Sequence, residues 1–327
     1  MRRAIELDEA RRMLLSRSGL LDRGVAEREI RLRVERGELV RVRRGWYAAA
    51  TDWQVLWPEG RHLLRVLAVQ HDATGSAPVF CGTSAGVLWG LPLYRTAPRR
   101  VHVAETRGRS RSTRDVLRHE TELADDDVAE IDGMRCTSLH RTVFDLARKL
   151  SAEAAVAGAD AALRAVAVTG QRQDEALAEE WREELGRRAH GSRARGVRQA
   201  RRIIAFADGR AQLPGESVSR LQLHRLGFRR IGLQVPVVLS RGQSYWIDFD
   251  LEEAGAFGEF DGEGKYLHAA LRSGRTVEQV VLDEKRREDT VRGVTGRRFV
   301  RWEAAHIRTP EALAERLAEF GVRPPRG

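Results

Sequence analysis

Two short apolar segments in the last third of the chain carry acidic residues at alternate positions. Asp248 and Asp250 lie in the segment Trp-Ile-Asp-Phe-Asp-Leu, and Glu259 and Asp261 lie in the segment Phe-Gly-Glu-Phe-Asp. Alternate residues of a β-strand share one face of a sheet. The pattern therefore predicts two neighbouring strands whose acids point into one shared space.

Four acids that face one space repel each other unless a positive charge lies between them. A divalent cation that prefers oxygen ligands, Mg²⁺ or Mn²⁺, is the simplest occupant. The alternative is that the acids lie on the solvated faces of edge strands. Large apolar neighbours, such as Trp246 and Phe260, favour burial and hence a metal site.

The composition suggests a soluble chain of several domains with a polyanionic partner. At 327 residues it exceeds one ordinary domain, and 57 basic against 47 acidic residues give a net charge of +10. Nucleic acid, most simply double-stranded DNA, is the expected partner; the alternative is a basic surface that merely reflects an arginine-rich composition. Only three lysines are present, and Lys265 and Lys285 lie in or shortly after the acidic segments.

Neither cysteines nor apolar runs indicate export. Cys81 and Cys136 lie far apart in apolar contexts, as expected of reduced core residues. The N-terminus has no signal-peptide pattern, and no apolar run approaches the length that spans a bilayer. We expect a cytoplasmic protein without a membrane partner.

Residues 1–50 have the pattern of a winged helix-turn-helix module. Helices are expected over 6–18 and 25–36, followed by a basic hairpin over 38–48. In such a module the second helix enters the major groove and the hairpin contacts phosphates. The alternative is a solvated charged helix and a basic turn. The candidate DNA-binding residues are Arg28, Arg31, Arg33, Arg41, Arg43 and Arg44.

Residues 51–150 alternate helix and strand signals and are expected to form an α/β middle domain, with His102, His119 and His140 in structural roles. Residues 151–210 favour helix and are expected to form a helical connector. Eight arginines lie between Arg182 and Arg202, and they suit either a connector or a surface that follows a phosphate backbone.

Residues 211–327 predict a final α/β domain. Helices are expected over 214–226, 276–293 and 310–320, and strands over 235–239 and 297–302 in addition to the two acidic segments. Pro236 places the 235–239 strand at a sheet edge, because proline cannot donate to a central ladder. The whole chain is thus expected to be multi-domain α/β, with a DNA-binding module first and an α/β layer last.

The last domain resembles the PD-(D/E)XK nuclease superfamily, and most closely its very-short-patch-repair type of endonuclease. The resemblance covers about residues 212–323. It rests on Glu216, on the strand segments around Asp248 and Glu259, on Glu284–Asp289 and on Phe299–Trp302. It implies a restriction-endonuclease-like fold that cleaves phosphodiester bonds with Mg²⁺ or Mn²⁺.

The resemblance also implies roles for individual residues. Asp248 and Glu259 would bind the ion, Glu216 would bind a second ion or orient the site, and a lysine would stabilise the developing charge. The superfamily usually has lysine where this chain has Asp261. Either Lys265 or Lys285 supplies that charge, or Asp261 has another role, or the site is inactive.

The N-terminal part, about residues 5–150, resembles the AbiEi-like antitoxin of AbiE-type bacterial abortive-infection systems. The resemblance rests on residues 37–47, 84–92 and 132–147. It implies a winged helix that binds promoter DNA, and a cognate toxin protein as a further partner. Three hypotheses follow: a DNA endonuclease that acts in phage defence or DNA repair, an antitoxin-type transcriptional repressor whose nuclease-like domain is inactive, or a protein that interacts with a toxin.

Overall fold

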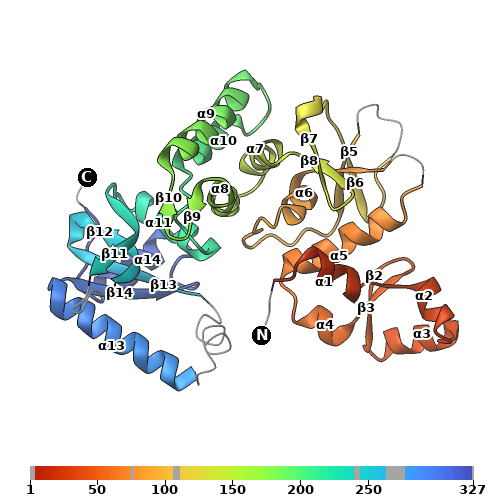
Figure 1. Cartoon of the computed structure of the whole chain (residues 1–327), viewed down its shortest axis with the longest axis horizontal. Coiled ribbons are helices and arrows are strands. Elements are labelled where there is room, and N and C mark those ends of the chain that lie inside the picture. Colours follow the sequence, from red (N-terminus) through yellow and green to blue (C-terminus); the bar gives the residue numbers. More distant parts are fainter. Residues whose placement is uncertain (1–3, 75–76, 106–110, 239–243, 263–276, 326–327) are drawn as a thin grey trace. The chain divides into compact units, whose positions relative to one another are not determined.

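The computed structural model describes residues 4–74, 77–105, 111–238, 244–262 and 277–325. Over these residues the chain is mixed α/β, as the sequence predicted, and its strands form four sheets (Figure 1). It divides into two compact units. The N-terminal unit comprises residues 1–158 and 184–204, and the C-terminal unit comprises residues 159–183 and 205–327.

The N-terminal unit begins with a helical and hairpin region and continues into a five-stranded sheet of order β6-β5-β4-β8-β7. Its elements are α1 (Leu7–Met13), β1 (Leu15–Ser16), α2 (Arg17–Asp22), α3 (Glu27–Glu35), β2 (Leu39–Arg43), β3 (Trp46–Ala49), α4 (Ala50–Gln54), α5 (Pro58–His71), β4 (Val79–Phe80), α6 (Gly82–Leu88), β5 (Val101–Glu105), β6 (Val116–Glu120), the 3₁₀ turn η1 (Asp125–Asp127), β7 (Val128–Ile131), β8 (Met134–Thr137) and α7 (Leu139–Lys149).

Three helices have residues in both units: α8 (Ala152–Ala167), α9 (Glu175–Gly191) and α10 (Val197–Phe206). The C-terminal unit has the short pair β9 (Val168–Thr169) and β10 (Arg172–Gln173), then α11 (Pro214–Arg225), β11 (Ile231–Val238), β12 (Ser244–Leu251), η3 (Glu252–Ala254), β13 (Ala256–Asp261), α13 (Val277–Thr295), β14 (Arg298–Glu303) and α14 (Pro310–Ala318).

The start of the chain departs from the expected single helix over 6–18. Helix α1 ends at Met13, and α2 begins after Ser16, whose hydroxyl accepts a hydrogen bond from the Gly19 amide at 2.9 Å. This serine caps the new helix and competes with continuation of the first. The residues between the helices form β1, which pairs with β3 in a sheet of order β1-β3-β2.

The cores of the N-terminal unit cross the expected boundary at residue 50. Ala10, Val42 and Ala48 belong to one apolar cluster with Leu64 and Phe80. A second, smaller cluster, formed by Leu20, Ile30, Leu39 and their neighbours, holds α2, α3 and the hairpin together. The expected division into 1–50, 51–150, 151–210 and 211–327 remains a prediction, and the compact units of the structure have other boundaries.

The C-terminal unit has the predicted element order around a four-stranded sheet, β11-β12-β13-β14. Strand β11, which contains Pro236, lies at an edge as predicted, and only β13 and β14 pair in parallel. One face packs on α11, where Trp302 Nε1 donates to Ser219 Oγ at 2.8 Å. Phe257 and Phe299 pack with Val291 of α13 in a separate cluster. The acidic strands are therefore sandwiched between helices.

Among the described residues, we find no helix with both the length and the apolar composition needed to cross a bilayer.

Candidate functional site

The candidate site lies where β12 and β13 stop pairing. The ladder between them runs from Leu251↔Ala256 to Phe249↔Gly258. Beyond it, the Phe260 amide donates not to the backbone of β12 but to Asp248 Oδ2, at 3.0 Å. The carboxylate thus satisfies a backbone donor that the separating strands would otherwise leave unpaired.

Glu216 reaches the same region from the first turn of α11. A Cβ atom on its neighbour Gly215 would lie 2.0 Å from the Phe260 ring. Only glycine therefore lets the helix approach the sheet this closely. Glu216 is 3% exposed, and its Oε2 accepts from the Gln212 amide at 2.8 Å.

Gln234 of β11 connects these two acids. Its Nε2 donates to Asp248 Oδ1 at 3.1 Å and to Glu216 Oε2 at 3.3 Å, while its Oε1 accepts from Gln212 Nε2 at 3.0 Å. Its φ is +48°, a left-handed conformation that costs a non-glycine residue about 1–2 kcal/mol. Such strain persists where surrounding contacts fix it, and it is concentrated at functional sites.

Sequence reasoning missed Gln234. A signal was available, because a buried amide in the middle of the apolar strand Ile231–Val238 needs hydrogen-bond partners. The two acids that it contacts were both predicted site residues. The structure therefore adds a residue that orients them.

Glu259 is held by a different set of partners. It is 1% exposed, and its Oε2 lies 3.3 Å from Arg301 Nη2 on the paired strand β14. The Tyr245 hydroxyl donates to its Oε1. Arg301 also pairs with Glu288 of α13, at 3.1 Å. A guanidinium thus balances the charge of this carboxylate.

The other two strand acids have separate surroundings. Asp250 forms a two-point ion pair with Arg297, whose guanidinium carbon lies 4.0 Å from the centre of the Phe257 ring. Asp261 is half-buried at the end of β13, in register with Glu303. The sequence predicted that all four acids share one space, and the described structure distributes them among different partners.

The described side chains, as placed, do not fit a magnesium or manganese ion. Among the described residues, no three acidic, histidine or cysteine side chains form a group that could hold a metal. Donors face the carboxylates instead: the amide of Gln234 for Glu216 and Asp248, and the guanidinium of Arg301 for Glu259. Lys265 and the side chain of Lys285, on α13, lie outside the described residues.

The arginines predicted to contact DNA fall into two groups. Arg28, Arg31, Arg41 and Arg44 are exposed on α3 and on the β2–β3 hairpin. Arg33 instead pairs with Glu29 at 2.9 Å. Exposure makes the first four available to a partner.

Arg43 is fixed by two aspartates, Asp72 and Asp115, and is 22% exposed. Partial burial favours the neutral form of Asp115, but hydrogen bonds from Arg43 and Thr113 outweigh it and lower the pKa of this carboxyl. Asp72 also accepts from Trp46 Nε1 at 2.8 Å. These contacts join the hairpin to the end of α5 and to the start of β6.

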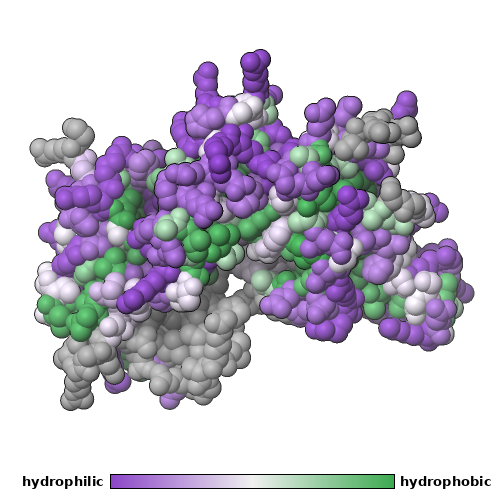
Figure 2. Space-filling view, turned by 45° about the horizontal axis from the view of Figure 1, so that its top comes forward, coloured by the Kyte–Doolittle hydropathy of each residue, from purple (hydrophilic) through white to green (hydrophobic). Residues whose placement is uncertain are grey.

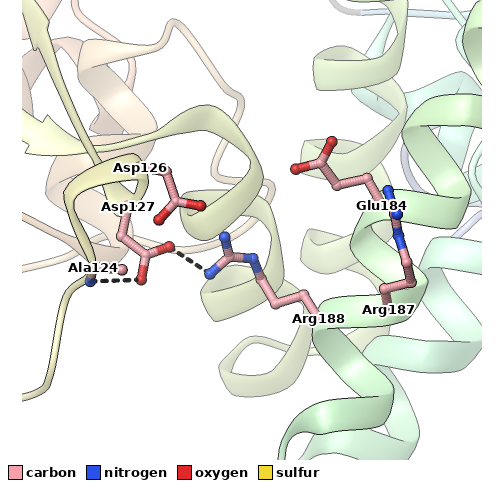
Figure 3. Close-up of a pocket in the computed structure, with 6 residues that line it drawn as sticks. All are labelled: Ala124, Asp126, Asp127, Glu184, Arg187 and Arg188. Atoms are coloured by element: carbon pink, nitrogen blue, oxygen red, sulfur yellow. Dashed lines mark hydrogen bonds and ion pairs between the residues drawn. The ribbon is translucent and has the colours of Figure 1, made fainter.

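A cavity of about 400 Å³ lies between η1 and the end of α9 in the N-terminal unit. Arg188 points toward the buried Asp127 and pairs with it, whereas Arg187 points away (Figure 3). Asp127 also pairs with Arg141 at 2.6 Å. Both carboxylate oxygens of Asp127 therefore face guanidinium groups, and this cluster holds the end of α9 in place.

No family model matches the sequence. The chain is similar to two proteins of Mycobacterium tuberculosis, the uncharacterized protein MT2308 of strain CDC 1551 / Oshkosh and the uncharacterized protein Rv2248 of strain ATCC 25618 / H37Rv. Each is 28% identical over 276 residues, which cover 81% of this chain and 93% of the relative. The similarity thus includes residues of both units, and neither name states an activity.

Proposed function

We propose that this chain is a DNA-binding protein whose N-terminal unit contacts double-stranded DNA as a winged helix-turn-helix. The supporting observation is the order α1-β1-α2-α3-β2-β3 with β3 central in its sheet. In a winged module this order presents the third helix to the major groove and the hairpin to the flanking backbone. The resemblance to AbiEi-like antitoxins supports the same assignment.

The exposed arginines decide where contact with DNA is made. Helix α3 holds as many glutamates as arginines, so its net charge attracts no polyanion by itself. Arg28 and Arg31 are the residues that would meet base edges or phosphates, and Arg41 and Arg44 would meet the backbone beside the groove. As DNA contacts, Arg33 and Arg43 would first have to open their ion pairs.

Fluorescence anisotropy with labelled duplexes tests this proposal. The wild type, an Arg41→Gln/Arg44→Gln variant and an Arg99→Gln/Arg100→Gln control are titrated with the upstream region of the chain's own gene and with a scrambled duplex. We expect the hairpin variant to bind more weakly and to lose about two units of the salt dependence of log K. Equal binding by variant and control would remove the hairpin from the interface.

A second candidate function is phosphodiester cleavage by the C-terminal unit, as the resemblance to PD-(D/E)XK nucleases implies. It is supported by the nearly complete burial of Glu216, Asp248 and Glu259, and by the strained backbone of Gln234 beside them. Buried acids destabilise a fold unless they are fully bonded, and such groups are concentrated at functional sites. The resemblance implies Mg²⁺ or Mn²⁺ as the cofactor, and these acids could bind it only after the donors of Gln234 and Arg301 move away.

The cleavage proposal is tested by nicking of supercoiled plasmid with Mg²⁺ or Mn²⁺ present or chelated. Asp248→Asn and Glu259→Gln remove charge at nearly constant shape and are expected to abolish nicking. Asp250→Asn, on the same strand, is the matched control and is expected to retain it. Metal-independent nicking, or equal nicking by all variants, would contradict the assignment.

The alternative is an antitoxin-type transcriptional repressor whose nuclease-like domain does not cut. The specific observation that favours it is the partnering of the acids, because Arg301 and Tyr245 engage Glu259 and the described residues include no metal-binding group. Tight promoter binding without nicking would support this reading. A cognate toxin would then be the second partner, testable by co-purification with the products of adjacent genes.

A further inference from the structure

The segment between Leu185 and Ala207 contains seven arginines and no acidic residue. The chain as a whole has 57 basic and 47 acidic residues, so both signs are mixed outside this segment. A run of one sign raises the electrostatic energy of the folded state through self-repulsion. An oppositely charged partner relieves that repulsion when it binds.

The structure assigns two of the seven arginines to the fold. Arg188 pairs with Asp127. Arg201 donates to the Ala189 carbonyl at 3.1 Å and to the His190 carbonyl at 3.5 Å, at the end of α9, where unpaired carbonyls and the helix dipole favour a cation. The other five are exposed, and Figure 2 shows the hydrophilic surface over α9 and α10 at the top of the view. They are Arg187, Arg193, Arg195, Arg198 and Arg202.

One face of α10 packs against the N-terminal unit, so the opposite face of the helix is exposed. Ala200, Ile203 and Ile204 are buried. Gln199 Nε2 donates at 2.8 Å to the carbonyls of both Ala147 and Leu150, and so caps the end of α7. Arg198 and Arg202, four residues apart, share the opposite side of the helix.

A close backbone contact adds Arg195 to the same region. The adjacent Gly196 has φ +84°, and a Cβ atom there would lie 2.1 Å from the Arg148 carbonyl oxygen. No side chain other than hydrogen fits at this position. The turn before α10 is therefore held against α7, and the exposed guanidinium of Arg195 precedes those of Arg198 and Arg202 along the chain.

We propose that Arg195, Arg198 and Arg202 form a second contact surface for the phosphate backbone of double-stranded DNA. Within the described residues, no large exposed hydrophobic side chain lies between 185 and 204. The core of a protein interface is enriched in aromatic side chains, and stable membrane binding takes an apolar or lipid anchor in addition to charge; residues 185–204 contain no phenylalanine, tyrosine or tryptophan. A phosphate backbone, which is uniformly anionic, matches a surface of arginine alone.

This inference rests on the proposed DNA binding and extends it to a surface outside the winged region. Both regions belong to the N-terminal unit, so one compact body carries them. Phosphate contacts by Arg195, Arg198 and Arg202 would add affinity for any sequence, while base contacts by α3 would supply selectivity.

The test is the salt dependence of duplex binding by the full chain, measured by fluorescence anisotropy with a random-sequence duplex. The surface variant is Arg195→Gln/Arg198→Gln/Arg202→Gln. The control, Arg99→Gln/Arg100→Gln/Arg114→Gln, makes the same change in net charge at exposed positions of the same unit. We expect the surface variant to lose about two to three units of the slope of log K against log salt, and to bind at least ~10-fold more weakly at low salt.

The Arg41→Gln/Arg44→Gln hairpin variant, measured in parallel, separates this inference from the proposed function. A surface variant that behaves like its control, beside a weakened hairpin variant, would overturn the second surface and leave the winged-helix proposal intact. The reverse result would support the second surface and overturn the hairpin. Preference for single-stranded RNA over the duplex, or no duplex binding by the wild type, would overturn double-stranded DNA as the occupant.

Discussion

The two units hold their important charges in opposite ways. In the N-terminal unit, Arg41 and Arg44 extend from a hairpin into solvent. In the C-terminal unit, Glu216, Asp248 and Glu259 are almost completely buried and engaged by protein donors. An exposed charge changes stability little but acts on partners at a distance, whereas a buried charge is tolerated only with its partners in place. Substitutions should therefore affect binding in one unit and stability in the other.

The largest effect is expected from Arg301→Met, which leaves Glu259 buried without its guanidinium. Removing one partner of a buried ion pair costs about 3–5 kcal/mol. We expect faster hydrogen exchange in β13 and β14, measured by mass spectrometry, with α5 of the other unit as an internal reference.

A second substitution, at Glu259, tests whether the unbalanced charge causes the faster exchange. Glu259→Gln combined with Arg301→Met removes both charges and is expected to recover most of the lost protection. If the double variant exchanges as fast as the single variant, packing of the Arg301 side chain, and not charge balance, explains the loss.

Gln234 provides the next test, because its side chain and its backbone contribute separately. Gln234→Ala removes the donor to Glu216 and Asp248 and should cost about 1–3 kcal/mol. Gln234→Gly removes the same donor but relieves the strain of φ +48°, so it should be more stable than the alanine variant by about 1 kcal/mol. Urea denaturation measures both; an alanine variant at least as stable as the glycine variant would argue against a strained backbone.

A buried histidine of the N-terminal unit, His62, is expected to make the stability of the fold depend on pH. His62 is fully buried, its Nε2 lies 2.8 Å from Ser84 Oγ, and burial together with Arg65 and His102 lowers the pKa of His62 to about 3. Below pH 6.5 the unfolded chain gains a proton here that the folded chain does not. The stability that this residue contributes is fully present above pH 6.5. Below that pH, His62 should lower the free energy of unfolding by roughly 1.4 kcal/mol per pH unit, until the pH reaches its pKa in the folded state.

The variant His62→Gln tests this expectation through the slope of the free energy of unfolding against pH, which does not depend on any overall loss of stability. Thermal or urea unfolding of the variant between pH 6 and 4 should depend less steeply on pH than in the wild type. His190→Gln, at an exposed position, controls for the removal of a histidine. An unchanged slope in the His62 variant would mean that other groups cause the acid sensitivity.

The sequence predicted the helices and strands of the last domain because hydrophobic periodicity and the residues that break it act locally. The helices α3, α11 and α14, and the edge position of Pro236, follow from hydrophobic spacing and proline chemistry. It could not show which charges meet, because those contacts join distant segments. Examples are Arg43 with Asp115, and Gln234 with Glu216 and Asp248. The break at Ser16 was missed because an apolar period was followed past a good helix cap.

The smallest effects should separate two neighbours on the hairpin, Arg43 and Arg44. Arg43→Gln breaks the pairs with Asp72 and Asp115, and solvent screening limits the loss of stability to about 1 kcal/mol. Because those pairs already occupy Arg43, the salt dependence of DNA binding should stay at the wild-type value. Arg44→Gln should do the reverse, lowering that dependence by about one unit while leaving stability within ~0.5 kcal/mol.

Thermal melts and anisotropy titrations on the same two variants distinguish these outcomes. If Arg43→Gln is the variant that lowers the salt dependence, the hairpin opens its ion pairs to meet DNA, and the contrast between exposed and partnered charge does not hold in the bound state.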